Sequence, residues 1–215
     1  MMKLSETAES ILLDIESGAA RMGDLRKIAK EIKKDHKLGM ELWGTGKFHP
    51  MLLAILIFDA KSLGFDAVDR LLEDIDRHDG DDRLQLADWL MANQLLKDKK
   101  LAAQVQSWQD DPAPLKRRIF WYHQARLRWT GQVPPNNTAG LMEAIENSIA
   151  GESPEVQWAM NFTAGWIGVF DTLYRNQCIT IGEKLGLYKD EMVAKNCTPS
   201  YLPKFIEIEA NKREL

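Results

Sequence analysis

Apolar residues return every three or four positions along most of the chain, which is the pattern of helices that bury one face. In the first segment they are Leu4, Ala8, Ile11, Leu12 and Ile15. The same spacing predicts further helices over residues 25–32, 51–58, 65–75, 84–96, 101–108, 115–129, 141–149, 156–170 and 178–187. The alternation of apolar and polar residues that marks a half-buried strand is rare. The sequence therefore predicts an all-α protein.

Prolines and glycines separate the predicted helices. Pro50, Pro112 and Pro154 stand where proline fits the first turn of a helix. Helix pairs begin near residues 48, 81, 112 and 154, a period of roughly 30–40 residues that approaches the range of stacked HEAT-type repeats. We therefore predict a HEAT-like helical-repeat superhelix, an α-α solenoid, with a concave face. An ordinary helical bundle has similar helices but need not space them so evenly.

We expect a single domain over residues 1–215, because a chain of this length can bury a sizeable core. Its parts are N-terminal helices in 1–45, core helix-pair repeats in 46–187 and a C-terminal extension in 188–215. In the extension, residues 188–200 are expected to be irregular and residues 201–212 to form a short helix that docks on the core.

Composition and charge narrow the possible partners. The 28 Lys and Arg residues against 32 Asp and Glu residues give a net charge of −4, which excludes a generally basic nucleic-acid binder. Any such binding must come from a local patch. The acidic residues of the first segment rule out the uncharged stretch of a signal peptide there, and the longest apolar run, 51–58, is too short to cross a membrane. We expect a cytoplasmic monomer.

A local basic patch does occur in residues 108–131. Cations alternate there with aromatic rings, and no Asp or Glu occurs between Asp111 and Glu143. The cations are Lys116, Arg117, Arg118, Arg126 and Arg128, and the rings are Trp121, Tyr122, His123 and Trp129. Such a mixture suits phosphates together with sugar or base faces. The alternative is an amphipathic helix whose aromatics are core and whose arginines are solvated.

Motifs for other chemistry are missing. The sequence has no GxxxxGK[ST] phosphate loop, no GxGxxG after a strand and no HExxH. Its four histidines and two cysteines show no spacing for a metal, so we expect no metal and no cofactor. Carboxylates, arginines and aromatics remain, and these groups bind polyanions and stabilise cationic transition states.

The order of several short segments resembles the AlkD-type alkylpurine DNA glycosylases, the DNA alkylation repair family built from HEAT-like helix pairs. The resemblance covers roughly residues 40–170. The segments are Glu41-Leu42-Trp43, the acidic segment Asp81–Asp88, Trp108, Lys116-Arg117-Arg118, and Glu155–Ala159 followed by Phe162 and Trp166. Each segment is short, and their order and spacing carry the likeness.

The resemblance implies an enzyme that excises N3- or N7-alkylated purines from double-stranded DNA without a metal or a base-flipping pocket. Such lesions carry a positive charge, so the base already leaves readily. A carboxylate then has to stabilise an oxocarbenium-like sugar and position a water, by analogy with glycoside hydrolysis. Aromatic residues hold the deoxyribose, and an arginine grips the backbone.

The family's carboxylate falls on this chain in two possible registers. One places it at Asp88, with Leu84 at the family's aromatic position. The other places Gln85 at the catalytic position, with Asp81 at the aromatic one. The run Asp88-Trp89-Leu90 matches the family better, so Asp88 is preferred. An aromatic is lost in either register, so catalysis is open to question. A solvated carboxylate at Asp88 and a surface amide at Gln85 are the alternatives.

The family's arginine and tryptophan positions are easier to place on this chain than its carboxylate position. Arg118 falls where the family has its cleft arginine, and the alternative role is a buried arginine that holds neighbouring repeats. Phe162 replaces the family's usual tryptophan, and Trp158 and Trp166 one turn away can share its role. Core packing is the expected fate of at least one of these rings. The expected DNA-binding residues are Lys116, Arg117, Trp121, Trp158 and Phe162, with Asp88 and Arg118 as the catalytic pair.

Two other functions compete with base excision. One keeps the DNA-binding shape without excision, because the family's catalytic positions are altered. The other is a helical-repeat scaffold whose aromatic groove takes a peptide helix.

Overall fold

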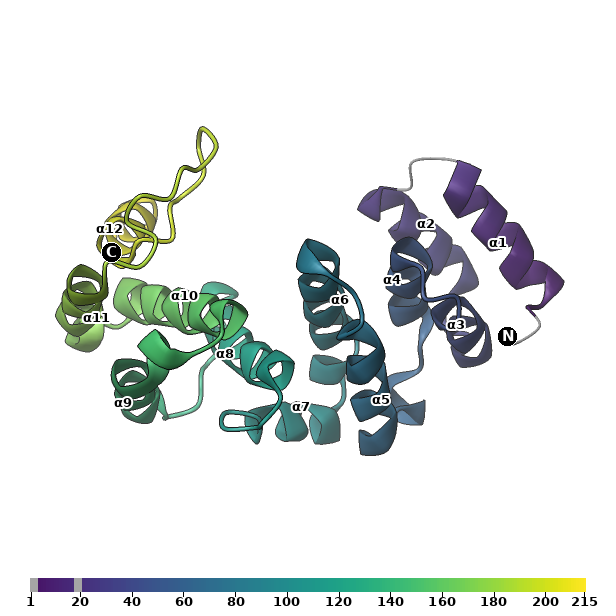
Figure 1. The fold of residues 1–215 in the computed structure, drawn as a ribbon, viewed down its shortest axis with the longest axis horizontal. Coiled ribbons are helices and arrows are strands. Elements are labelled where there is room, and N and C mark those ends of the chain that lie inside the picture. The colour runs from purple at the N-terminus through teal and green to yellow at the C-terminus, as the bar shows by residue number, and fades with distance from the viewer. Residues whose placement is uncertain (1–3, 18–20) are drawn as a thin grey trace. The chain divides into compact units, whose positions relative to one another are not determined.

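The computed structural model describes residues 4–17 and 21–215, and the secondary structure of these residues is helical throughout (Figure 1). The helices are α1 (Glu6–Ser17), α2 (Met22–Ile32), α3 (His36–Trp43), α4 (Phe48–Ile57), α5 (Phe65–Ile75), α6 (Gly80–Asn93), α7 (Lys99–Gln106), α8 (Pro114–Trp129), α9 (Thr138–Ser148), α10 (Pro154–Phe170), α11 (Thr172–Leu185) and α12 (Leu202–Asn211). Short 3-10 turns lie at Ala60–Ser62, Leu95–Lys97 and Ile149–Gly151. The all-α prediction is confirmed. Among these helices, none is long and apolar enough to cross a membrane.

The chain divides into two compact units, Met1–Gln106 and Ser107–Leu215. The division falls at the end of α7, inside the segment 46–187 that the sequence assigns to one run of repeats. The boundaries expected after residues 45 and 187 differ from this division, which falls between Gln106 and Ser107. A single domain over the whole chain therefore stays a prediction.

In the N-terminal unit, α2, α4 and α6 pack one on the next, while α3 packs on α4 and α5 on α6. The central member is α4, whose sequence FHPMLLAILI is almost wholly apolar and almost wholly buried. Side chains of α6 and the residue after it satisfy backbone groups of α4. The Trp89 indole Nε1 donates to the Leu52 carbonyl at 3.1 Å, and the buried amide of Gln94 donates to the Ile55 and Phe58 carbonyls.

The C-terminal unit is built around α10, which packs against α8, α9, α11 and α12. Glu155 is the only charged residue in this helix, so α10 can bury most of its surface. The hydroxyl of Thr163 joins α10 to α8. Its oxygen lies 2.6 Å from the Trp121 carbonyl oxygen on α8 and 2.8 Å from the Ala159 carbonyl oxygen on α10, so it can donate to either. Both oxygens compete for this one proton in a fully buried position.

Within each unit the even-numbered helices stack in order, and the odd-numbered ones flank them. The stacked helices α4, α6, α8 and α10 begin at Phe48, Gly80, Pro114 and Pro154, close to the predicted pair starts. This is the packing of helix-pair repeats, in which each pair buries its apolar face on the next.

The predicted C-terminal helix docks as α12 against α10 and α11. Three glycines allow the approach. A Cβ added at Gly165 would lie 2.7 Å from the Phe205 ring, one at Gly168 would lie 2.5 Å from Ile206, and one at Gly182 would lie 2.6 Å from the Leu202 Cβ. The loop before α12 is tied to α10 as well, because the Asn161 amide donates to the Ser200 carbonyl at 2.7 Å. The C-terminal segment is therefore an integral part of the unit.

A candidate nucleic-acid interface

Four aromatic residues follow one another at successive turns of α10. Trp158, Phe162, Trp166 and Phe170 are each four residues apart, which places them along one face of the helix. Trp158 and Phe162 stack at 4.9 Å between ring centroids, and Trp166 and Phe170 stack at 5.7 Å. Phe162 meets Trp166 edge to face at 5.9 Å. The result is a continuous row of rings.

Helix α8 adds two rings to this row. Tyr122 stacks on Phe162 at 5.9 Å, and Trp129 lies nearly parallel to Trp166 at 6.4 Å. Helix α12 adds Phe205, whose ring meets Trp166 edge to face at 5.3 Å. We call these residues the ring cluster: Tyr122, Trp129, Trp158, Phe162, Trp166, Phe170 and Phe205. Trp166 and Phe205 are buried, Trp129 and Phe170 are exposed, and the other three are half-buried.

Three guanidinium groups lie over rings of the cluster. The Arg118 Cζ is 5.5 Å from the Tyr122 ring and 5.8 Å from the Trp158 ring, and Arg118 is only 3% exposed. Arg126 lies 6.0 Å from Trp129, and Arg213 lies 4.7 Å from Trp166. Cations at these distances are attracted by the faces of the rings. The cluster therefore combines flat apolar faces with positive charge.

The structure brings together three of the residues singled out from the sequence, namely Arg118, Trp158 and Phe162. The ring of Phe162 stacks on Trp158, and Arg118 lies over Trp158. Of the two neighbouring tryptophans, Trp166 is the one that packs in the core, with 4% of its surface exposed. The expectation that at least one of these rings is core is confirmed.

Three other predicted residues have different surroundings. Trp121 is 2% exposed and packs against Phe120 in the core of the unit, so its ring does not take part in the ring cluster. Arg117 makes a two-point ion pair with Glu152 at 3.0 and 2.7 Å and donates to the Asp111 and Pro112 carbonyls. Lys116 lies 3.7 Å from the Asp111 carboxylate and 5.6 Å from the Trp108 ring. Their contact with DNA stays a prediction.

Two more polar groups of the basic stretch are buried in α8. Arg128 is 6% exposed and donates to the Gln124 carbonyl and to the Thr138 hydroxyl at the start of α9. Burial, together with the charge of Arg126, lowers the pKa of His123 to about 4. This imidazole is therefore neutral near neutral pH. The alternative of solvated arginines is wrong for Arg118 and Arg128, since both are buried.

The sequence analysis missed three members of the site, Phe170, Phe205 and Arg213. Phe170 continues the four-residue spacing of the α10 aromatics, so the sequence contained a signal for it.

Arg213 follows the end of α12, where its Nη1 donates to the Glu209 carbonyl at 2.9 Å and to the Glu209 carboxylate at 2.5 Å. Burial alone would raise the pKa of Glu209, but hydrogen bonds from Lys212, Thr198 and Arg213 hold it at about 2. Glu209 therefore stays charged and fixes Arg213.

The two candidates for the family's carboxylate position both lie on α6, in the N-terminal unit. Asp88 is half-buried, while Gln85, one turn earlier, is exposed. The residue after Asp88, Trp89, makes two contacts that fix its side chain. Its indole donates to the Leu52 carbonyl, and the Arg26 guanidinium lies 4.5 Å from the centre of its ring. Leu84, at the family's aromatic position in the preferred register, is half-buried.

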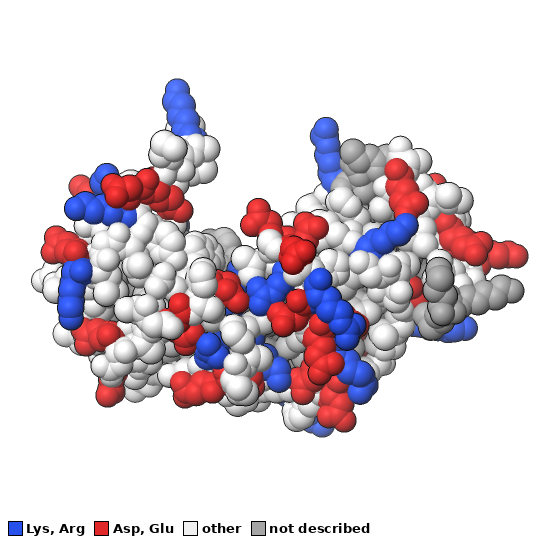
Figure 2. Space-filling model, in the orientation of Figure 1, with Lys and Arg blue, Asp and Glu red and all other residues white. Residues whose placement is uncertain are grey.

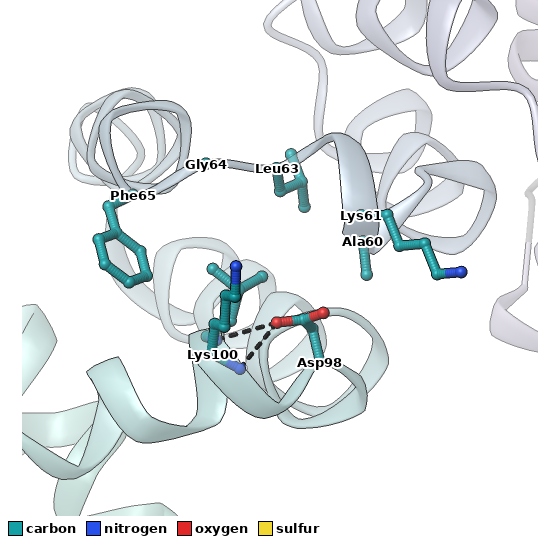
Figure 3. A pocket seen from close by; sticks show the side chains of 8 residues that line it. Ala60, Lys61, Leu63, Gly64, Phe65, Asp98 and Lys100 are labelled. Carbon is teal, nitrogen blue, oxygen red and sulfur yellow. Dashed lines mark hydrogen bonds between the residues drawn. The ribbon is translucent and has the colours of Figure 1, made fainter.

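The N-terminal unit also has an open pocket of about 430 Å³. It lies between the turn that leads into α5 and the start of α7 (Figure 3). Its lining residues are Ala60, Lys61, Leu63, Gly64, Phe65, Asp98, Lys100 and Leu101. The Asp98 carboxylate accepts from the Lys100 and Leu101 amides at 2.8 and 3.2 Å. This carboxylate caps α7 and faces a pocket that Lys61 and Lys100 also line.

Charged side chains of both signs are interspersed on the face drawn in Figure 2. Within residues 4–17 and 21–215, no group of three or more His, Cys, Asp or Glu side chains is arranged to hold a metal ion.

A comparison with solved structures supports the class of fold. One solved structure matches with a TM-score of 0.66 and 17% sequence identity, over 98% of this chain and 89% of that chain. It is described as a new family of proteins related to the HEAT-like repeat DNA glycosylases with affinity for branched DNA structures. The fold is thus HEAT-like, as the helix-pair period predicts.

The sequence pattern of the DNA alkylation repair enzyme family matches residues 14–163. This is most of the chain, and the chain belongs to that family. The resemblance inferred from the short segments is confirmed. A search among curated proteins found no match for this chain.

Proposed function

We propose that this protein binds double-stranded DNA and excises cationic N3- or N7-alkylated purines from it. The observation that supports this best is the position of the Arg118 guanidinium over the Tyr122 and Trp158 rings, beside the Trp158–Phe162 stack. A guanidinium suits a phosphate, and a ring face beside it suits a deoxyribose or a base. Arg118 grips the backbone in this proposal, and Trp158 with Phe162 forms the aromatic wall.

Asp88 supplies the carboxylate for the chemical step. The bond between the sugar and the base breaks with both electrons going to the base, whose positive charge is neutralised as it leaves. A carboxylate stabilises the positive charge that develops on the sugar and orients a water, which adds to the sugar and passes a proton to that carboxylate. Family membership is consistent with this assignment, because Asp88 lies inside the matched segment 14–163, and the resemblance places the family's carboxylate there in the preferred register.

The basic residues beside Arg118 have smaller parts in this proposal. Lys116 is half-buried near Asp111 and adds positive charge for a phosphate. Arg117 would have to share its guanidinium between a phosphate and Glu152, and it also holds the turn before α8 through the Asp111 carbonyl. We therefore expect Arg117 to contribute more to the stability of the unit than to DNA affinity.

A second candidate function is DNA binding without excision. In the register that makes Asp88 the carboxylate, it is favoured by Leu84 at the family's aromatic position. In the other register, it is favoured by the exposed amide of Gln85 at the catalytic position. The matched solved structure is described as having affinity for branched DNA, which also fits a binding protein. In this case Arg118, Trp158 and Phe162 keep their role in binding duplex DNA, and the family's catalytic step is lost.

Release of methylated purine from alkylated duplex DNA tests the proposal. The wild type should release base, and Asp88→Asn should abolish release while DNA affinity stays equal or rises, because a repulsive charge is removed. If Gln85 occupies the catalytic position instead, the wild type should be nearly inactive and Gln85→Asp should gain activity. Full release by Asp88→Asn would contradict our assignment. Duplex binding without release by any of the three proteins would establish the second candidate.

A further inference from the structure

Part of the ring cluster lies beyond the segment that matches the family. The family's pattern ends at residue 163, so it includes Trp158 and Phe162 and excludes Trp166, Phe170 and Arg213. The row of rings does not end there, because Trp166 stacks on Phe170 at 5.7 Å and Trp129 lies parallel to Trp166 at 6.4 Å. The end of the row therefore lies outside the matched segment.

This end of the row is open to solvent. Trp129 is 42% exposed and Phe170 is 43% exposed, while Trp166 between them is 4% exposed. Both exposed rings contact Trp166, and exposed apolar groups that are rimmed by polar residues often mark a binding site. Trp166 holds the two exposed rings in place, because it stacks with both.

Arginines surround the two exposed rings. Arg126 lies 6.0 Å from Trp129, and Arg213 lies 6.0 Å from Phe170. Arg175 donates to the Gly168 and Val169 carbonyls, immediately before Phe170. Arg213 donates from Nη1 to the Glu209 carbonyl and carboxylate. Glu209 and Asp171 are the nearby acids, and Glu209 is already bound by Lys212 and Arg213.

We propose that Trp129 and Phe170 form a stacking site for unpaired nucleotides, with Arg126 and Arg213 on the adjoining phosphates. Flat exposed rings between guanidinium groups suit a DNA single strand, since every base has a face that can stack and every nucleotide carries a phosphate. A peptide helix fits less well, because three arginines around two rings favour a polyanion. The inference rests on the proposed DNA binding and extends it to DNA in which a duplex continues into a single strand.

Fluorescence anisotropy with three labelled DNAs tests this site. One DNA is a blunt duplex, the second carries a single-stranded thymidine tail, and the third carries a tail of abasic nucleotides that has phosphates but no bases. The wild type should bind the thymidine-tailed duplex about tenfold more tightly than the blunt duplex, because stacked bases add to the affinity. The abasic tail should give little of this gain.

Variants of the exposed rings provide the second half of the test. Trp129→Ala and Phe170→Ala should each lose most of the gain from the thymidine tail and keep their affinity for the blunt duplex. Trp129→Phe should retain the gain, because it keeps a ring. Leu173→Ala is the matched control, since Leu173 is an 80% exposed apolar residue close to Phe170 in the sequence. Thermal melting should show that all four variants fold.

The possible outcomes separate this inference from the proposed function. Binding of the blunt duplex with no gain from the thymidine tail would overturn the stacking site and leave the proposed function standing. An equal gain from the abasic tail, or a gain that survives Trp129→Ala and Phe170→Ala, would also overturn it. Binding of the tailed DNA alone would support the stacking site and contradict duplex binding.

Discussion

Arg118 is an unusual residue for a DNA contact because it is 3% exposed. A buried guanidinium is held in one orientation by its neighbours, here the Tyr122 and Trp158 rings. This fixed orientation reduces the side-chain entropy that a phosphate contact would otherwise cost. The alternative of a purely structural arginine predicts the same burial, so the two roles differ in their consequences for binding.

Replacement of Arg118 distinguishes these roles. Arg118→Ala should weaken duplex binding by about 1–3 kcal/mol, because a charge-assisted contact is lost. It should also reduce the salt dependence of binding by about one phosphate contact. Arg118→Lys should keep the salt dependence but lose part of the affinity, since lysine has no planar group to stack on the rings.

Lys184→Ala is the control for the Arg118 variants, because it removes the same charge from an exposed position on α11. Anisotropy titrations at several salt concentrations give both quantities, and thermal melting tests the fold. If Arg118→Ala remains folded and binds with the affinity and salt dependence of the wild type, Arg118 is structural only.

Single residues were predictable where their partners lie on the same helix. The sequence places Trp158 and Phe162 one turn apart, and the structure stacks them. Trp121 was not separable from Tyr122 by sequence, because both follow the arginines and only packing decides which ring turns inward. Trp121 is buried, and Tyr122 contacts Phe162. Arg117 was equally ambiguous, because its partner Glu152 lies far away in the sequence.

At the scale of elements, the docking of α12 determines which residues lie at one end of the ring cluster. Phe205 comes from α12 and meets Trp166 edge to face, and Arg213 follows the same helix. The approach depends on Gly165, where an added Cβ would meet the Phe205 ring at 2.7 Å. A Cβ atom is essentially never this close to a carbon atom to which it is not bonded, so any larger residue must displace the ring.

Gly165→Ala should therefore destabilise the unit by about 1–3 kcal/mol, the usual cost of overpacking a core. Partial release of α12 should also speed proteolysis within residues 186–200. Gly140→Ala is the matched control, because Gly140 lies in α9 and an added Cβ there meets nothing within 4 Å. That variant should be neutral or more stable by up to about 1 kcal/mol, from helix propensity. Equal melting temperatures for the two variants would contradict the role of Gly165.

Most helices were predictable because their apolar faces are periodic. The exceptions are α3, which was not predicted, and α11, whose start was predicted too late. The sequence analysis missed α3, a short helix whose N-terminus is capped by Asp35 accepting from the Leu38 amide at 2.9 Å. It also started α11 six residues late, at Cys178, because Thr172–Gln177 is mostly polar. Asp171 caps this helix, accepting from the Leu173 amide at 3.1 Å. Both helices begin at a capping aspartate. A capped helix can start with a polar first turn, and the spacing of apolar residues does not reveal such a turn.

At the scale of the whole molecule, the helix-pair period was sufficient to predict the fold, and the family resemblance was sufficient to predict the family. The site was predictable only in part. Its residues inside the matched segment, Arg118, Trp158 and Phe162, were identified. Phe205 on α12 and Arg213 just after α12 lie outside the matched segment and were not. Contacts between distant segments depend on how helices dock, and three glycines on α10 and α11 determine that docking.

Under the proposed function, the range of lesions that the protein can process follows from the groups available for catalysis. Asp88 and the arginines offer electrostatic and positional help, which is sufficient when the leaving base is already cationic, as in 7-methylguanine or 3-methyladenine. Neutral bases such as uracil and hypoxanthine need a proton or strong stabilisation as they leave. His123 does not supply that proton, because burial and the charge of Arg126 lower its pKa to about 4 and it is unprotonated at neutral pH.

We therefore expect excision to be confined to positively charged alkylpurines and to be unaffected by a chelator. Chromatography of the bases released from three duplexes, containing 7-methylguanine, hypoxanthine or uracil, measures this directly, with and without EDTA. Release should occur from the first duplex only, and EDTA should leave its rate unchanged. Asp88→Asn is the control that separates enzymatic release from the spontaneous loss of 7-methylguanine. Uracil release, or a rate that falls on chelation, would show that the reaction needs a proton donor or a metal that this mechanism does not include.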